Sequence, residues 1–181
     1  MLRKLFHLSG IVIPVAYLLT ERRTALVVSA ALFVAMGVFE FLRIKGILKI
    51  DFVGKYTKDQ ERKRPLGSFY YALAALIVIL FFNKETAVAS LFTLSISDPL
   101  SSIIGSRLGR VHILGKTLEG TLTFFVSSLC IFLLFSFGPY TAVAGAAVSS
   151  LTELLSGRPI DDNLSIPIVT ACALAALSRL I

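Results

Sequence analysis

Seven long apolar runs occupy most of this sequence, and they leave few folds open to it. Each run is long enough, or nearly long enough, to cross about 30 Å of hydrocarbon as a helix. The runs cover residues 5–19, 24–42, 67–82, 86–104, 118–137, 140–155 and 165–181. None of them alternates apolar and polar residues with the period of two that barrel strands require, so we expect helices.

The composition agrees with an all-α integral membrane protein. The chain has 181 residues, of which 56% are hydrophobic and 16% are charged, and its mean hydropathy is +0.84. A soluble domain carries about 25% charged residues. We therefore expect one polytopic membrane domain over residues 1–181, with about seven transmembrane helices. The basic and apolar start is similar to a signal peptide, but a second apolar run follows at once, so we expect a retained first span. Cys130 and Cys172 lie within apolar runs and are expected to be reduced core residues.

The basic residues are unevenly divided between the two sides of the expected membrane. When alternate connections are assigned to opposite sides, 14 of the 18 lysines and arginines fall on one side. That excess predicts a cytoplasmic N-terminus. It also accounts for most of the net charge of +7 without a nucleic-acid partner. Nine of the eleven acidic residues fall on the same side. Orientation does not require these acids, so we expect chemistry at the cytoplasmic face.

The longest connection, residues 43–65, separates the second and third expected helices. Its apolar residues fall close to helical spacing between lysines. This pattern predicts an amphipathic segment lying in the headgroup region. Its charged end, residues 58–65, is also a candidate contact for a polyphosphate.

Asp98 and Pro99 interrupt the fourth apolar run about 10 Å inside its cytoplasmic end. An ionisable residue at the centre of a spanning helix costs about 2.5–3.5 kcal/mol on insertion scales, and it usually faces protein or a water-filled cavity. Asp98 is either the partner of a buried arginine at a structural kink or a functional carboxylate at the floor of a cavity. We favour a metal ligand or a catalytic group.

Gly115, Lys116 and Thr117 lie directly before the fifth run. A Walker A motif is excluded because the residue five positions before Gly115 is Arg110. Thr117 is a good N-cap, and Lys116 beside a helix start makes an anion site for phosphate oxygens. A capped helix with a snorkelling lysine is the alternative. Glu119, one residue further into the helix than Leu118, either stabilises the helix start or helps Asp98 to hold a divalent cation.

A third polar cluster lies between the last two runs. Asp162 or Asn163 can cap the final helix, but capping needs one such residue and Asp161 is also present. Oxygen ligands suit Mg²⁺, which proteins usually bind through one or two carboxylates plus substrate phosphates. Glu153, near the end of its run, is not easily explained as a cap.

Two smaller patterns lie nearer the N-terminus. Arg3, Lys4 and His7 fall near one face of a helix at the membrane surface, where they form either a headgroup-level belt or contacts to a substrate phosphate. Glu40 and Arg43 are three residues apart and are predicted to pair on a helix. The sequence contains no zinc-ligand spacing, no Gly-x-Ser-x-Gly elbow and no Rossmann fingerprint.

The order of these motifs resembles the dolichol kinase and phytol kinase family. The matching segments are Arg3-Lys4-Leu-Phe-His7-Leu-Ser-Gly10, Glu40-Phe-Leu-Arg43, Asp98-Pro-Leu-Ser-Ser-Ile-Ile-Gly105, Gly115-Lys116-Thr117-Leu-Glu119-Gly120, Glu153 and Asp161-Asp162-Asn163-Leu-Ser-Ile-Pro167. The resemblance implies a multi-span enzyme that phosphorylates a lipid alcohol with CTP, and CTP-dependent diacylglycerol kinases belong to the same group. The chain also resembles the phosphatidate cytidylyltransferases, but it lacks their C-terminal signature.

We therefore expect a CTP:lipid-alcohol phosphotransferase that uses Mg²⁺·CTP at the cytoplasmic face. The candidate metal ligands are Asp98, Glu119, Glu153, Asp161, Asp162 and Asn163. The candidate catalytic residues are Asp98, Lys116, Glu119 and Glu153, with Asp98 orienting or deprotonating the substrate hydroxyl. The candidate contacts for CTP are Arg3, Lys4, His7, Arg107, Arg110, Lys116 and Thr117, with Lys116 and Thr117 at the β- and γ-phosphates and Arg107 or Arg110 offsetting charge during transfer.

Two other functions stay open on the residues alone. The first is cytidylyl transfer onto a lipid phosphate, and the second is a small membrane transporter or scaffold whose acids bind cations or protons. The acceptor is likewise open among polyprenol or dolichol, phytol or geranylgeraniol, and diacylglycerol. Gly145 with its neighbouring alanines offers a close-packing helix face for a homo-oligomer.

Overall fold

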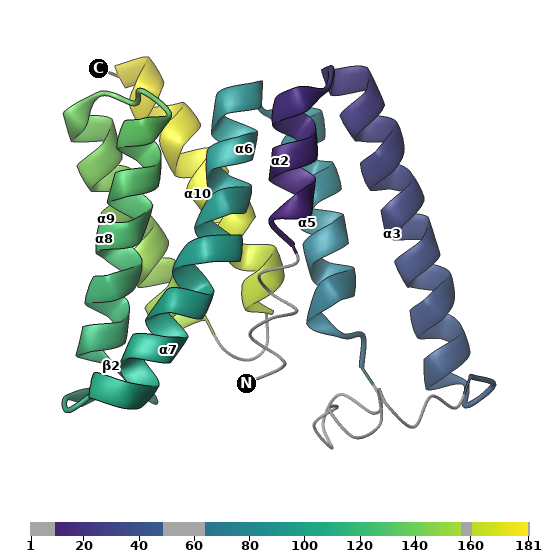
Figure 1. Cartoon of the computed structure of the whole chain (residues 1–181), viewed down its shortest axis with the longest axis horizontal. Helices are drawn as coiled ribbons and strands as arrows, with labels where there is room; N and C mark the ends of the chain where they lie inside the picture. The colour runs from purple at the N-terminus through teal and green to yellow at the C-terminus, as the bar shows by residue number, and fades with distance from the viewer. Residues whose placement is uncertain (1–9, 49–63, 157–160, 181) are drawn as a thin grey trace.

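The computed structural model describes residues 10–48, 64–156 and 161–180, which form a bundle of helices with one short hairpin (Figure 1). The elements are α2 (Val12–Leu19), α3 (Arg22–Ile44), α5 (Gly67–Phe81), α6 (Lys84–Phe92), the π-helix η2 (Thr93–Ser97), α7 (Asp98–Leu108), β1 (His112–Ile113), β2 (Lys116–Thr117), α8 (Leu118–Leu134), α9 (Pro139–Leu155) and α10 (Asp162–Leu180). Every apolar run of the sequence contains helical residues, and α6, η2 and α7 together form the fourth.

Three of these helices are long and apolar enough to cross a membrane. They are α3, the continuous helix Lys84–Leu108, and α10, whereas α5 and α8 are shorter apolar helices. The structure therefore confirms a helical membrane protein. Seven spans and a cytoplasmic N-terminus remain predictions. Most of the predicted amphipathic segment, residues 49–63, lies outside the described residues.

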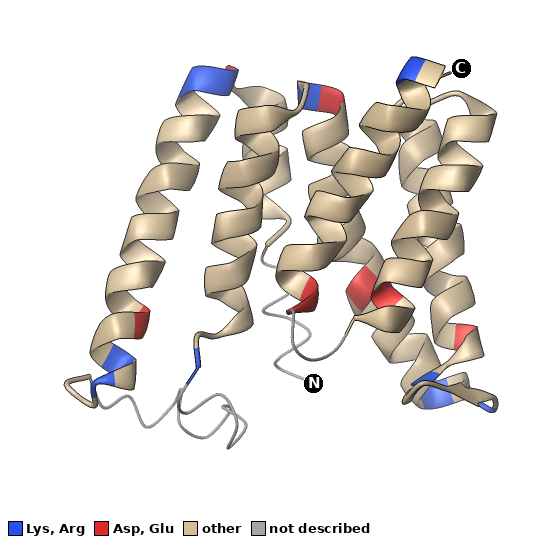
Figure 2. Ribbon diagram, turned by 180° about the vertical axis from the view of Figure 1, so that it is seen from behind, with Lys and Arg blue, Asp and Glu red and all other residues tan. Residues whose placement is uncertain are grey.

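Lysines and arginines lie at the two ends of the bundle, several acids lie further inside one end, and the segment between these acids and the other end is apolar (Figure 2). One end carries the C-terminal end of α3, the β1–β2 hairpin and the first turn of α10, and the other carries the start of α3, the start of α6 and the C-terminal end of α10 (Figure 1). This distribution matches an apolar layer of about 30 Å between two polar interfaces.

Small residues let the second half of the chain pack closely. Helices α7, α8, α9 and α10 each lie against the next one along the chain, and α7 and α8 are connected through the hairpin. A Cβ added at Gly105 on α7 would lie 3.4 Å from the Cα of Gly120 on α8. A Cβ added at Gly145 would lie 2.8 Å from Leu174, so the close-packing face predicted at Gly145 is used within this chain, between α9 and α10.

Both cysteines are free, as predicted, but the expectation that they belong to the core was wrong. Cys130 and Cys172 are exposed on the outside of the bundle. An apolar helix in a membrane bundle has a lipid-facing side as well as a packed side. Apolar neighbours in the sequence therefore do not show that a residue lies in the core.

A π-helix precedes Asp98 and Pro99, at the position where the sequence predicts a kink. Pro99 lies in the first turn of α7 and has no N–H to donate to the carbonyl four residues earlier, so one α-helical hydrogen bond is lost there. The π-helix η2 occupies the five residues before Asp98. The buried Ser95 of η2 lies 3.0 Å from the hydroxyl of Tyr71 on α5, and that hydroxyl donates to the carbonyl of Gly10 at 2.8 Å. The irregular segment is thus tied to α5 and to the beginning of the described chain.

Candidate active site

The β1–β2 hairpin places Lys116 and Thr117 directly before α8. His112 pairs with Thr117 and Ile113 with Lys116 in an antiparallel register, so the turn consists of Leu114 and Gly115. The hydroxyl of Thr117 accepts a hydrogen bond from the N–H of Gly120 at 3.2 Å, which confirms the predicted N-cap.

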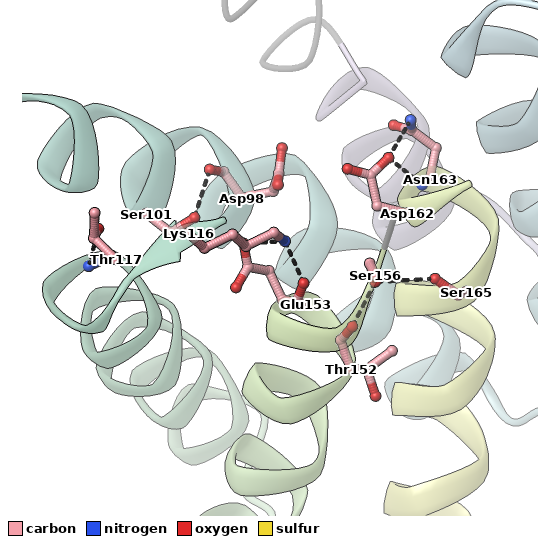
Figure 3. Close-up of polar contacts among 11 residues, drawn as sticks. Asp98, Ser101, Lys116, Thr117, Thr152, Glu153, Ser156, Asp162, Asn163 and Ser165 are labelled. Carbon is pink, nitrogen blue, oxygen red and sulfur yellow. Dashed lines mark hydrogen bonds and ion pairs between the residues drawn. The ribbon is translucent and has the colours of Figure 1, made fainter. Parts of the chain in front are cut away.

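Lys116 reaches across the bundle end to the C-terminal turn of α9. Its Nζ lies 2.6 Å from Oε1 of Glu153 and also donates to the backbone carbonyl of Glu153 (Figure 3). The two side chains are 27% and 7% exposed, and Oε2 of Glu153 is buried without a hydrogen-bond partner. Lys116 is therefore a partly buried cation in an ion pair rather than a snorkelling lysine, and a phosphate bound beside it would share it with Glu153.

Asp98 opens α7 at a half-buried position. Its side chain and that of Asp162 on α10 extend toward the same region, beside the pair formed by Lys116 and Glu153 (Figure 3). The hydroxyl of Ser101 donates to the backbone carbonyl of Asp98 at 2.9 Å. The structure thus brings together acids from α7, α9 and α10.

Asn163 joins the two acids at the start of α10. Its side-chain Nδ2 donates to Oδ1 of Asp161 at 2.7 Å and to Oδ1 of Asp162 at 3.0 Å, and its backbone N–H also points to both oxygens. Burial raises the pKa of Asp161, the hydrogen bond from Asn163 opposes this shift, and the charge of Asp162 adds to it. Two neighbouring carboxylates that share one amide donor place negative charge close together, and this arrangement favours a bound cation.

Glu119 holds the chain between α7 and β1, a contact that neither of its two sequence-based alternatives included. Its Oε1 accepts hydrogen bonds from the backbone N–H of Arg110 at 2.9 Å and of Val111 at 3.4 Å. These bonds hold the segment between α7 and β1 against the start of α8. Its Oε2 is buried without a hydrogen-bond partner. Among the described residues, no three His, Cys, Asp or Glu side chains gather closely enough to hold a metal by themselves. A Mg²⁺ site here would need substrate phosphates to complete it, as is usual for this ion.

The predicted phosphate contacts are only partly near this region. Arg107 and Arg110 are exposed, and Arg107 follows Asp98 by nine residues, which places it on the opposite face of α7. Arg3, Lys4 and His7 lie outside the described residues. The predicted pair of Glu40 and Arg43 is confirmed.

The Glu40–Arg43 pair ties α3 to the segment that precedes α5. Arg43 Nε donates to Oε2 of Glu40 at 3.0 Å, and its Nη2 also donates to the backbone carbonyl of Arg64. Glu40 is 2% exposed, and its Oε1 has no hydrogen-bond partner. A few residues on, Gly67 packs so closely on α10 that an added Cβ would lie 2.5 Å from Nδ2 of Asn163. No sequence pattern indicated this contact, because it joins segments almost a hundred residues apart.

Comparisons with known proteins show which proteins this chain is similar to. An uncharacterized protein of Rickettsia prowazekii is 30% identical over 92% of this chain and 88% of its own length. The dolichol kinase of Saccharomyces cerevisiae is 35% identical over 62% of this chain, and CTP-dependent diacylglycerol kinase 1 of Schizosaccharomyces pombe is 28% identical over 67%. The chain spans 24% and 65% of these two kinases, respectively. No family model and no solved structure matches. Over much of its length the chain therefore resembles the CTP-dependent lipid kinases.

Proposed function

We propose that this chain is a CTP-dependent kinase that transfers the γ-phosphate of CTP to the hydroxyl of a membrane lipid alcohol at the cytoplasmic face. The observation that carries the proposal is the ion pair of Lys116 and Glu153 beside Asp98 and Asp162, at one end of an apolar bundle. Acids and a cation at the membrane boundary suit a reaction between a water-soluble nucleotide and a lipid. Two relatives named for phosphorylating lipids support the same reaction.

Lys116 and the N-terminus of α8 form the phosphate-binding side of the proposed site. The free N–H groups of the first turn and the charge of Lys116 favour the β- and γ-phosphates. Glu119 positions this side, because it holds the segment that leads into β1. Arg107 and Arg110 remain candidates to offset charge, although both side chains are exposed.

The acids are a chemical fit for Mg²⁺. Oε2 of Glu153 is buried without a hydrogen-bond partner, and Asp161 and Asp162 share a single amide. These are hard oxygen donors that lack sufficient positive charge, which is what a divalent cation provides. Asp98, Glu153, Asp161, Asp162 and Asn163 are the residues that would hold it. When bound, Mg²⁺ neutralises charge on the phosphates during transfer.

Asp98 is the proposed acceptor of the substrate proton. The alcohol oxygen attacks the γ-phosphorus and forms a new P–O bond, the bond to the β-phosphate oxygen breaks, and CDP leaves. The hydroxyl proton passes to the Asp98 carboxylate. Asp98 begins α7 inside the continuous helix Lys84–Leu108, so a lipid hydroxyl arriving between helices meets it below the membrane surface. The reaction depends mostly on positioning and charge.

A transfer assay with two labelled forms of CTP tests this proposal. Purified protein receives CTP labelled at either the γ- or the α-phosphate, together with a polyprenol, a phytol-like alcohol, diacylglycerol or phosphatidate. Entry of the γ label into an alcohol supports the kinase and identifies the acceptor class. Entry of the α label into phosphatidate would instead establish a cytidylyltransferase. If neither label moves and Mg²⁺·CTP does not bind, the transporter or scaffold alternative replaces the kinase.

A further inference from the structure

The β1–β2 hairpin carries an exposed apolar tip that the proposed reaction does not use. Leu108 at the end of α7 is 62% exposed, Val111 before β1 is 49% exposed, and Leu114 in the turn is 71% exposed. The hairpin lies at the outer edge of the bundle end that also holds the candidate site (Figure 1). These three exposed side chains lie within seven consecutive residues at and just before the hairpin, and we call them the hairpin tip.

The turn is built in a way that ordinarily excludes leucine. Leu114 and Gly115 have φ values of 50° and 82°, so both central residues are left-handed, as in a type I′ turn. Asn, Asp and Gly dominate the first position of such turns because they tolerate this conformation. A leucine at this position strains the backbone and exposes a large apolar side chain. In water, neither cost is offset by a favourable interaction.

The hairpin lies at headgroup depth when the bundle spans a bilayer. The continuous helix from Lys84 to Leu108 has 25 residues, which corresponds to about 37 Å at about 1.5 Å per residue. The hydrocarbon core is about 30 Å thick, and the headgroups extend the bilayer to about 40–45 Å. Lys84 marks one interface, so Leu108 and the hairpin that follows lie within the headgroup layer of the other.

Two cations flank the apolar tip. Arg107 and Arg110 are both exposed on either side of Leu108, and Arg107 lies on the face of α7 opposite Asp98. Guanidinium groups bind phosphate oxygens in a bidentate manner, and basic residues at this depth are attracted to anionic lipids. Apolar side chains interleaved with arginines are typical of segments that lie in the membrane interface.

We propose that the hairpin tip is a membrane-surface anchor for a leaflet that contains anionic phospholipid. Leu108, Val111 and Leu114 enter the boundary between headgroups and acyl chains, while Arg107 and Arg110 contact the headgroup phosphates. Because the turn leads directly into β2, which consists of Lys116 and Thr117, the anchor fixes the phosphate-binding side of the candidate site against the bilayer surface. The proposal depends on the membrane position of the bundle and not on the kinase reaction.

Tryptophan fluorescence can measure the depth of the tip, because the chain has no tryptophan of its own. The full chain with Leu114→Trp is reconstituted in vesicles of phosphatidylcholine, with or without phosphatidylglycerol, that contain lipids brominated near the headgroup or deep in the acyl chain. We expect blue-shifted emission that shallow bromines quench more strongly than deep ones, and stronger quenching with phosphatidylglycerol. Val111→Trp provides a second probe if the first variant does not fold.

Two controls make the result decisive. Val34→Trp, at an exposed position midway along α3, should be quenched most by deep bromines. In the Leu114→Trp background, Arg107→Gln with Arg110→Gln should abolish the effect of phosphatidylglycerol. Emission typical of water without quenching would overturn the anchor, and so would blue-shifted emission that no brominated lipid quenches, which indicates a protein contact. Equal quenching with and without phosphatidylglycerol would overturn the preference for anionic lipid. The readout needs no catalysis, so its outcome is independent of the transfer assay.

Discussion

Lys116 on β2 and Glu153 on α9 form an ion pair of 2.6 Å across 37 residues of sequence. The whole of α8 and most of α9 lie between them, so the pair closes the loop formed by these two helices. The Glu153 side chain is only 7% exposed, and a carboxylate removed from water in this way requires a partner charge. The pair therefore supports the fold as well as the proposed site, and the two roles can be separated by experiment.

The pair predicts a specific pattern of stability. Lys116→Met leaves the buried Glu153 charge uncompensated and should lower the free energy of unfolding by about 3 kcal/mol. Adding Glu153→Gln removes that charge, so the double variant should regain most of the lost free energy of unfolding. Phosphate transfer should be absent in both variants. Unfolding in detergent measures the first effect, and the transfer assay measures the second. If the two substitutions are simply additive, the residues do not stabilise the protein as a pair.

The N-cap at Thr117 predicts a smaller loss. Thr117→Val keeps the shape of the side chain but removes the oxygen that accepts from Gly120, and it should cost about 1 kcal/mol. CTP should also bind more weakly, because the capped turn is the proposed phosphate site. Thr117→Ser keeps the oxygen and is the matched control. Equal unfolding temperatures for the Val and Ser variants would contradict the capping role.

The close approach of α5 to α10 can be tested at Gly67. An added Cβ would lie 2.5 Å from Nδ2 of Asn163, which must then move away from Asp161 and Asp162. We expect Gly67→Ala to weaken the stabilisation of the protein by Mg²⁺·CTP and to slow transfer. Gly37→Ala is the control, since its Cβ would meet Phe69 at an ordinary 3.6 Å and alanine favours a helix over glycine. Similar behaviour of both variants would exclude a role for the contact.

Asp161 predicts a pH dependence. Burial raises the pKa of its carboxyl above the ordinary value of 3.8, so the folded chain binds the proton more tightly than the unfolded chain. Stability contributed by this group is therefore lost as the pH rises from 3.8 through the raised pKa. Asp161→Asn should be more stable than the unchanged protein at neutral pH without Mg²⁺, and the difference should vanish at low pH. Unfolding temperatures measured across this range check the sign.

The same substitution separates stability from cation binding. If Asp161 helps to hold Mg²⁺, Mg²⁺·CTP should raise the unfolding temperature of the unchanged protein more than that of Asp161→Asn. An Asn variant that Mg²⁺·CTP stabilises to the full extent would remove Asp161 from the proposed ligands.

Asp98 is the residue on which the proposed chemistry depends most. Asp98→Asn should leave the bundle folded but lower the transfer rate by about a hundredfold or more, because the amide cannot accept the proton. Ser101→Ala is a matched control one turn along α7, since its hydroxyl donates to the Asp98 carbonyl and not to the carboxylate. Retained transfer in the Asn variant with an unchanged pH profile would mean that another group acts as the base.

Local sequence patterns predicted a large part of this structure. The apolar runs correspond to helical segments, because a run of this length can satisfy its backbone in a bilayer only as a helix. The Thr117 cap and the pair of Glu40 and Arg43 were predictable for a similar reason. Each involves residues three apart, a spacing that helix geometry alone brings together.

Contacts between distant segments were not predictable in this way. The sequence marked Lys116 and Glu153 as chemically important but did not pair them, and it did not indicate Gly67 at all. It left Glu119 either at the helix start or beside a cation with Asp98, and it did not indicate that Oε1 of Glu119 holds the segment before β1. It also assigned both cysteines to the core, although they are exposed. In each case the outcome depends on how helices rotate and pack against one another.

The sequence by itself determined that the chain is a helical membrane protein, because hydrophobic length acts within one segment, and it predicted a set of residues that can carry chemistry. Only the tertiary structure decided which of those residues meet. The approach of Lys116 to Glu153 depends on how β2 and the end of α9 are placed, and that of Gly67 to Asn163 depends on the close packing of α5 on α10. That packing is a property of whole surfaces in contact and is not encoded in any single stretch of the chain.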